Sequence, residues 1–130
     1  MRIGICDDDK LWCERAQKII EEYAVIRHLM IQISIFVSGE EVIKYEGEPL
    51  DVLFCDIELE NMQEESAQER IDDATKENGI TLAMKVNRRW EQCQIVYVTN
   101  YLYYATEIYQ TTHIFFVLKE QFEKRIDEIF

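Results

Sequence analysis

The sequence predicts an α/β fold built on a parallel sheet. Short, continuous apolar runs recur along the chain, as expected for strands that are buried on both faces. Stretches with helical spacing of apolar residues lie between these runs, and strands that alternate with helices form parallel sheets with right-handed crossovers. The chain has 130 residues, of which 48% are hydrophobic, which is enough for one domain with its own core.

Five segments are predicted as strands. Four of them are continuous apolar runs, whereas Ile31, Ile33 and Ile35 alternate with polar residues, which is the pattern of an edge strand. Five such strands fit the flavodoxin-like order 2-1-3-4-5, in which the first and third strands lie side by side. The strands are expected at about 2–6, 30–37, 51–56, 94–99 and 114–118.

Helices are predicted between the strands, from apolar residues at helical spacing. Asp9 is a candidate N-cap for the first helix, and Ser38 with Glu41 has the spacing of a capping box that starts a short second helix. The last helix is expected to be still running at Phe130. The helices are expected at about 10–24, 39–45, 81–91, 102–110 and from 120 onward.

Residues 60–77 interrupt this pattern with seven acidic and two basic residues and little apolar content. This composition favours a solvated surface, either a mobile loop or a helical excursion. A calcium site is the alternative, but the segment lacks the spaced acids and the turn glycine of a calcium-binding loop. We therefore expect an acidic insertion between the third strand and the helix at 81–91.

The charge and the cysteines argue against several classes of function. A formal net charge of -12 argues against nucleic-acid binding by this domain and against anionic membranes, and it suits cations and basic partner surfaces. No apolar run approaches the ~20 residues that span a bilayer, and no signal-peptide pattern is present, so the cytoplasm is the expected location. None of the four cysteines forms a C-x-x-C pair, which argues against a zinc site.

Polar residues follow the predicted strands at the point where each strand ends. Asp7 and Asp8 follow the first strand, and Asp56 closes the third. Thr99 closes the fourth strand, and Lys119 follows the fifth. Ligands of open α/β sheets bind beyond the carboxyl ends of the strands. The order 2-1-3-4-5 therefore brings the three aspartates into one pocket, with the threonine and the lysine on the other side of the third strand.

These residue types suit the chemistry of a phosphoryl group. Three adjacent carboxylates repel one another, so they share protons or bind a cation, and oxygen ligands with room for water suit Mg²⁺. The ion, the ammonium of Lys119 and the hydroxyl of Thr99 can together hold phosphoryl oxygens. Asp56 is the central carboxylate and the candidate nucleophile, which would form an acyl phosphate. Taken singly, each residue could instead be a helix cap or a turn residue, but their combination favours the functional interpretation.

Five segments, in their order along the chain, match a known family. With them the chain resembles the receiver domain of bacterial two-component response regulators, a CheY-like fold, over 1–130 apart from 60–77. The residues around Asp7 and Asp56, with Tyr104-Ala105 after Thr99, resemble the branch fused to LytTR-type DNA-binding domains. The matching segments are Ile5-Cys6-Asp7-Asp8-Asp9, Phe54-Cys55-Asp56-Ile57-Glu58-Leu59, Asn78-Gly79-Ile80, Val96-Tyr97-Val98-Thr99 and Phe116-Val117-Leu118-Lys119.

The resemblance implies a role for each residue of the acidic group. Asp56 would accept a phosphoryl group from the phosphohistidine of a sensor histidine kinase, so the chain would be a signalling phosphoacceptor rather than an enzyme. Asp8 would bind Mg²⁺ directly and Asp7 through water. Asp56 and the main-chain carbonyl of Glu58 would complete the protein ligands.

The resemblance also implies a switch. Thr99 and Lys119 would contact the phosphoryl group, and Phe116 would be an aromatic switch residue whose ring moves inward when Thr99 moves toward that group. The change would bias the face formed by the helix at 102–110, the strand at 114–118 and the last helix, through which a homodimer could form. DNA would be bound only by a C-terminal effector domain, which is expected outside 1–130.

Two departures from the family leave alternatives open. Glu60-Asn61 and the insertion replace the usual Pro-Gly turn, so the insertion either gates access of the phosphodonor or lengthens the following helix. Glu120 replaces the proline that follows the lysine, often through a cis bond. Without proline a cis bond costs about 3–4 kcal/mol, which leaves open whether Lys119 is placed as in the family. The competing functions are a receiver that binds partners without phosphorylation, and a Mg²⁺-dependent phosphohydrolase with an aspartyl nucleophile and Glu58 as the second acid.

Overall fold

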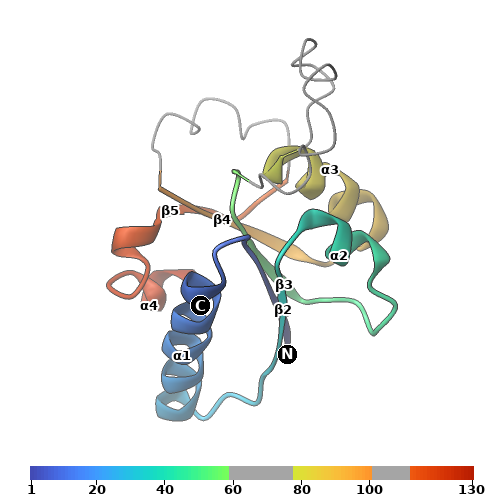
Figure 1. The fold of residues 1–130 in the computed structure, drawn as a ribbon. Coiled ribbons are helices and arrows are strands. Elements are labelled where there is room, and N and C mark those ends of the chain that lie inside the picture. Colours follow the sequence, from blue (N-terminus) through green and yellow to red (C-terminus); the bar gives the residue numbers. More distant parts are fainter. Residues whose placement is uncertain (59–77, 101–111) are drawn as a thin grey trace.

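The sheet has the predicted topology. The structure, a computed structural model, describes residues 1–58, 78–100 and 112–130. Five strands form one sheet in the order β2-β1-β3-β4-β5, and every neighbouring pair is parallel (Figure 1). The strands are β1 (Arg2–Cys6), β2 (Gln32–Phe36), β3 (Val52–Cys55), β4 (Gln94–Thr99) and β5 (Phe115–Leu118).

Burial explains why these segments are strands. All four residues of β3, and all but the first residue of β1 and of β4, are buried, because helices cover both faces of the central strands. The alternating segment forms β2 at the edge of the sheet, as predicted, and its residues are mostly half-buried. The continuous apolar runs thus mark the strands that position the carboxyl-end residues.

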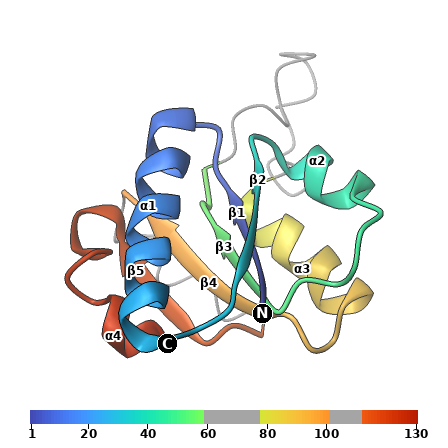
Figure 2. The ribbon, with the colours of Figure 1, turned by 90° about the horizontal axis from the view of Figure 1, so that it is seen from below.

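Helices pack on both faces of the sheet (Figure 2). One core cluster joins the sheet to α1 (Lys10–Arg27) and α4 (Ile126–Ile129). The other core cluster joins it to α2 (Gly39–Lys44) and α3 (Gly79–Arg89). The guanidinium of Arg89 links the two helices of this second layer, since it donates hydrogen bonds to the carbonyls of Val42, Ile43 and Tyr45.

Helix α1 runs one turn beyond its predicted end. It stops at His28, which has a left-handed backbone (φ 58°, ψ 40°). The N–H of Leu29 donates to the carbonyl of Ala24 at 2.8 Å, which closes the helix end. Glycine is the usual residue in this conformation, and its absence from the sequence here hid the true end of the helix.

Helix α3 begins two residues before its predicted start. The side chain of Asn78 accepts hydrogen bonds from the N–H groups of Ile80 and Thr81, and the Thr81 hydroxyl accepts from the N–H of Asn78. This capping box fixes the first turn. The helix ends at Arg89 because Trp90 is extended (φ -130°, ψ 90°) and packs into the core.

The prediction of a continuous last helix is wrong. A 3-10 turn at Lys119–Gln121 is followed by turns, and only Ile126–Ile129 is α-helical. Hydrogen bonds between residues three apart dominate here, such as those from Phe122 to Lys119 and from Glu128 to Arg125. The apolar stripe was predicted correctly, since Phe122 and Ile129 are buried, so side-chain burial rather than a regular helix holds this segment on the sheet.

Other predictions can be compared only in part. The helix at 102–110 and the acidic insertion at 60–77, with its calcium alternative, lie outside the described residues. Within the described residues, none of the helices has the length and apolarity that a membrane crossing requires. The four cysteines are buried and free of disulfides.

The end of α1 gives a test of the fold. A left-handed residue other than glycine costs roughly 1–2 kcal/mol in backbone energy. We therefore expect His28→Gly to raise the free energy of unfolding by roughly 0.5–1 kcal/mol, measured by urea denaturation. His28→Val, with a branched Cβ, should lower it. Equal stability of the two variants would contradict the left-handed assignment.

Candidate functional site

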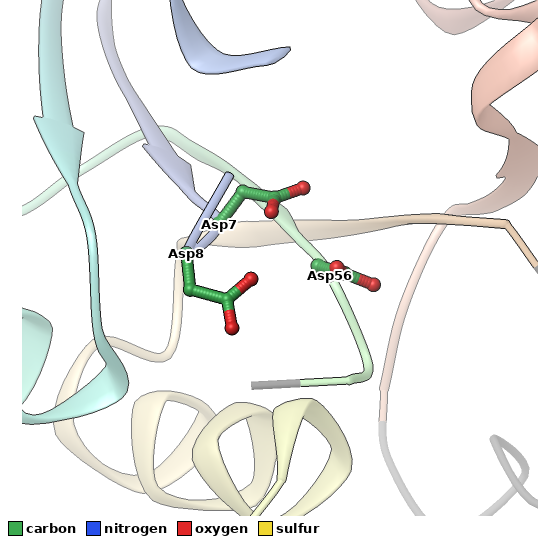
Figure 3. Close-up of side chains that lie close together, drawn as sticks. All are labelled: Asp7, Asp8 and Asp56. Carbon is green, nitrogen blue, oxygen red and sulfur yellow. The ribbon is translucent and has the colours of Figure 1, made fainter. Parts of the chain in front are cut away.

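Three aspartates lie together at the carboxyl ends of adjacent strands (Figure 3). Asp7 and Asp8 follow β1, and Asp56 follows β3, which pairs with β1. Each offers one carboxylate oxygen, and these oxygens lie within 4.8 Å of one another. Asp7 is 1% exposed and Asp56 is 6% exposed, whereas Asp8 is half-buried. The prediction that these three side chains meet is confirmed.

Backbone groups hold the two buried carboxylates in equivalent ways. Oδ1 of Asp7 accepts a hydrogen bond from the N–H of Asp9 at 2.9 Å. Oδ1 of Asp56 accepts one from the N–H of Glu58 at 3.2 Å. In both cases the donor lies two residues beyond the aspartate, which fixes the carboxylate by the turn that leaves the strand. The second oxygen of each carboxylate then faces the lysine.

Lys119 brings an ammonium group to both carboxylates. Its Nζ lies 2.7 Å from Oδ2 of Asp7 and 3.5 Å from Oδ2 of Asp56, and its side chain is only 10% exposed. Apart from this ion pair, Oδ2 of Asp7 has no hydrogen-bond partner among the described residues. The Lys119–Glu120 bond is trans, as are the other peptide bonds of the described residues. Lys119 therefore stays in the site although a glutamate follows it.

The burial of the site raises the pKa values of both buried aspartates. Burial raises the pKa of the Asp56 carboxyl to about 7, the charge of Asp7 adds to this, and the Lys119 ammonium opposes it. Burial also raises the pKa of Asp7, again against Lys119. Burial disfavours the charged form of Lys119, but the hydrogen bond to Asp7 and the charge of Asp56 outweigh it and raise its pKa. Among the described groups of the site, three carboxyl groups share the single ammonium group of Lys119.

The donor set fits a small divalent cation. All three ligand groups are carboxylate oxygens, which Mg²⁺ prefers, and the half-buried Asp8 leaves a side open to water. A divalent cation would also stabilise the ionised form of Asp56, which burial and the charge of Asp7 disfavour by raising its pKa. The residues present therefore suit Mg²⁺.

Two further predicted site residues, Thr99 and Glu58, lie at the same edge of the sheet, whereas Phe116 lies within β5, opposite Tyr97. Thr99 ends β4 and is fully buried. In the register of β4 and β5 it lies opposite Leu118, the residue that directly precedes Lys119. The N–H of Glu58 donates the hydrogen bond to Oδ1 of Asp56 that is described above. Phe116 lies in β5, is half-buried, and packs against the core cluster beneath α2 and α3.

Two residues near the site were not predicted to act there. Gly79 opens α3, and its N–H donates to the carbonyl of Ile57 at 2.7 Å. A Cβ at Gly79 would overlap the backbone of Asp56 and Ile57. Trp12, in α1, lies beside Lys119. The Asn-Gly pair was a visible turn signal, but only the packed fold shows that its glycine lies against the strand that carries Asp56.

The buried charge at Asp56 predicts how stability depends on pH. The pKa of Asp56 is about 7 in the folded protein and near 3.9 in an unfolded chain, so the folded state binds more protons between these values. Stability is therefore lost as pH rises through this window. In EDTA, Asp56→Asn should raise the free energy of unfolding by about 2 kcal/mol more at pH 8 than at pH 5.

Urea denaturation of both proteins at both pH values measures this difference. Glu91→Gln, which removes an exposed carboxylate, is the control and should show no such pH-dependent gain. A stability difference between wild type and Asp56→Asn that does not change with pH would contradict the buried-charge assignment.

Gly79 gives a second test of the site. Gly79→Ala forces the start of α3 away from the backbone of Asp56 and Ile57, so we expect weaker Mg²⁺ binding and roughly 1–3 kcal/mol lower stability. Calorimetric titration with Mg²⁺ and urea denaturation measure the two effects. Gly47→Ala is the control for the binding measurement, because its Cβ would overlap the ring of Tyr45, away from the aspartates, and should leave Mg²⁺ binding unchanged. Unchanged binding and stability in Gly79→Ala would show that the close approach is not required.

Solved structures share this fold over nearly the whole chain. The response regulatory domain of Klebsiella pneumoniae mrkE is 21% identical, with a TM-score of 0.74, over 99% of this chain and 91% of that one. Response regulator TrrA from Thermotoga maritima, in complex with Mg²⁺ and BeF, is 19% identical, with a TM-score of 0.73, over 98% and 95%. A Burkholderia pseudomallei response regulator with a phosphorylated aspartic acid is 13% identical, with a TM-score of 0.72, over 96% and 63%.

No protein-family model matches the sequence, and no curated protein matches it either. The likeness to solved structures is therefore one of architecture. A parallel sheet in the order β2-β1-β3-β4-β5, with helices on both faces, is the fold of response regulator receiver domains.

Proposed function

We propose that the chain is a phosphoacceptor receiver domain of a two-component response regulator, and that Asp56 accepts the phosphoryl group. The observation that carries the proposal is the position of Asp56. Its carboxylate lies beside two further aspartates and within 3.5 Å of the ammonium of Lys119, in the receiver fold. The phosphorylated aspartic acid of the Burkholderia pseudomallei protein supports an aspartate as acceptor.

The transfer is a displacement at phosphorus. A carboxylate oxygen of the ionised Asp56 forms a bond to phosphorus as the phosphorus–nitrogen bond of a kinase phosphohistidine breaks, and the imidazole nitrogen leaves with the electron pair. Lys119 lies 3.5 Å from Asp56 Oδ2, so its ammonium can stabilise the added phosphoryl oxygens. Thr99, at the end of β4, would donate its hydroxyl to another of these oxygens.

Mg²⁺ would be held by the acidic group and would supply charge neutralisation for the phosphoryl oxygens. The half-buried Asp8 suits direct binding, because Asp7 is already engaged by Lys119 at 2.7 Å and would act through water. Asp56 and the main-chain carbonyl of Glu58 would complete the protein ligands. The complex of TrrA with Mg²⁺ and BeF supports this choice of ion.

The switch would be carried by Thr99 and Phe116. Phe116 is half-buried against the core. In the proposed switch its ring would move between a more exposed and a more buried position. Occupation of the site would shift the population between the two positions and alter the surface around β5, where a second copy could bind. A cytoplasmic location of the chain, a sensor histidine kinase as donor and a LytTR-type DNA-binding domain outside 1–130 as output belong to the same proposal.

A small phosphodonor tests the proposal. The protein is incubated with phosphoramidate and MgCl₂, and its intact mass is followed with time. We expect one phosphoryl group per chain and no adduct in Asp56→Asn. When EDTA replaces MgCl₂ in the reaction, we expect no adduct to form. Glu91→Gln, an exposed carboxylate variant, should be phosphorylated like the wild type.

Two other results would contradict the proposal, and each would favour a different function. Repeated release of inorganic phosphate without an adduct would indicate a phosphohydrolase. Absence of both an adduct and Mg²⁺ binding would indicate a receiver that binds its partners without phosphorylation.

A further inference from the structure

The cation of the site is in contact with an aromatic ring. Trp12 lies in the first turn of α1 and is half-buried. Nζ of Lys119 lies over its indole ring, 5.5 Å from the ring centroid, within the range of a cation–π interaction. The same ammonium group contacts Asp7 and Asp56, so it has carboxylates and an indole ring among its neighbours.

The indole ring is itself held by the core. The ring of Phe122, which is buried, packs edge-on against Trp12 with centroids 5.4 Å apart. Phe122 also packs edge-on against Phe54 with centroids 5.5 Å apart. Phe54 belongs to β3, two residues before Asp56. A chain of three rings therefore ties the contact partner of Lys119 to the strand that carries the candidate phosphoacceptor.

Other carboxylates lie near the lysine. An open depression of about 770 Å³ lies beside Lys119, and Asp9 and Glu120 are among the residues that line it. A flexible lysine side chain loses rotamer entropy when it is held in one place. The ring of Trp12 also lines the depression, so it can favour the lysine rotamer that points at Asp7 and Asp56 over those that point at the acids of the depression.

We propose that Trp12 is a positioning residue, whose indole face holds the ammonium of Lys119 against Asp7 and Asp56. This inference rests on the proposed function in one respect, because the consequence of correct placement is faster phosphoryl transfer to Asp56. The contact between the two side chains is independent of that function and can be measured separately.

The first experiment measures transfer. With phosphoramidate and saturating Mg²⁺, Trp12→Leu should lower the maximal rate of Asp56 phosphorylation roughly three- to tenfold, as expected for loss of a cation–π contact. The donor concentration at half-maximal rate and the affinity for Mg²⁺ should not change. Trp12→Phe keeps an aromatic face and should restore most of the rate. Trp90→Phe, at the core cluster on the other face of the sheet, is the control and should react at the wild-type rate.

The second experiment measures the contact without any reaction. The chain has two tryptophans, so Trp90→Phe leaves Trp12 as the sole indole emitter. In this background Lys119→Met should change the intensity or the wavelength of Trp12 emission. Lys124→Met, which removes an exposed lysine that lines the same depression, should leave the emission unchanged.

The outcomes test the positioning role of Trp12 separately from the phosphorylation of Asp56. If the wild type is phosphorylated and Trp12→Leu reacts at the same rate, the positioning role is overturned and the phosphoacceptor stands. If the wild type takes no phosphoryl group, the proposed function fails. The emission of Trp12 still shows whether its indole ring contacts Lys119. Emission that does not respond to Lys119→Met overturns the inference in either case, including the case in which Trp12→Leu does not fold.

Discussion

The burial of excess negative charge beside one lysine is the constraint on which the rest of the site depends. Asp7 and Asp56 are almost completely buried because they directly follow β1 and β3, the central strands of a sheet covered on both faces. Buried carboxylates are costly unless they are protonated, paired or bound to a cation. Lys119 pairs with both, and a divalent cation would supply the remaining charge.

The surrounding structure holds this arrangement from several directions. Backbone N–H groups fix one oxygen of each buried carboxylate, and Gly79 lets α3 approach the backbone of Asp56. The ring of Trp12 lies under the ammonium of Lys119 and is braced through Phe122. The strand ends, the start of α3 and the aromatic packing therefore all position the same few side chains. The proposed phosphoryl transfer would require such preorganisation.

The strands and the aspartate cluster could be predicted from the sequence because both depend on local patterns. A continuous apolar run marks a buried strand, and an acid at its end must emerge at the carboxyl edge. The misplaced ends had other causes. His28 adopts a left-handed conformation without glycine, and the segment after Lys119 forms short-range turns although its apolar stripe suits a helix. The roles of Gly79 and Trp12 could not be predicted, because they arise from contacts between distant parts of the chain.

The chemical identity of the phosphorylated residue tests the central claim most directly. An acyl phosphate on an aspartate is reduced by borohydride to homoserine, which changes the mass of one peptide. After treatment with phosphoramidate and Mg²⁺, followed by borohydride and proteolysis, we expect homoserine at position 56 and intact aspartates at positions 7 and 8. Modification of Asp7 or Asp8 in place of Asp56, or a phosphoryl group on a histidine, would contradict the assignment of Asp56 as the phosphoacceptor.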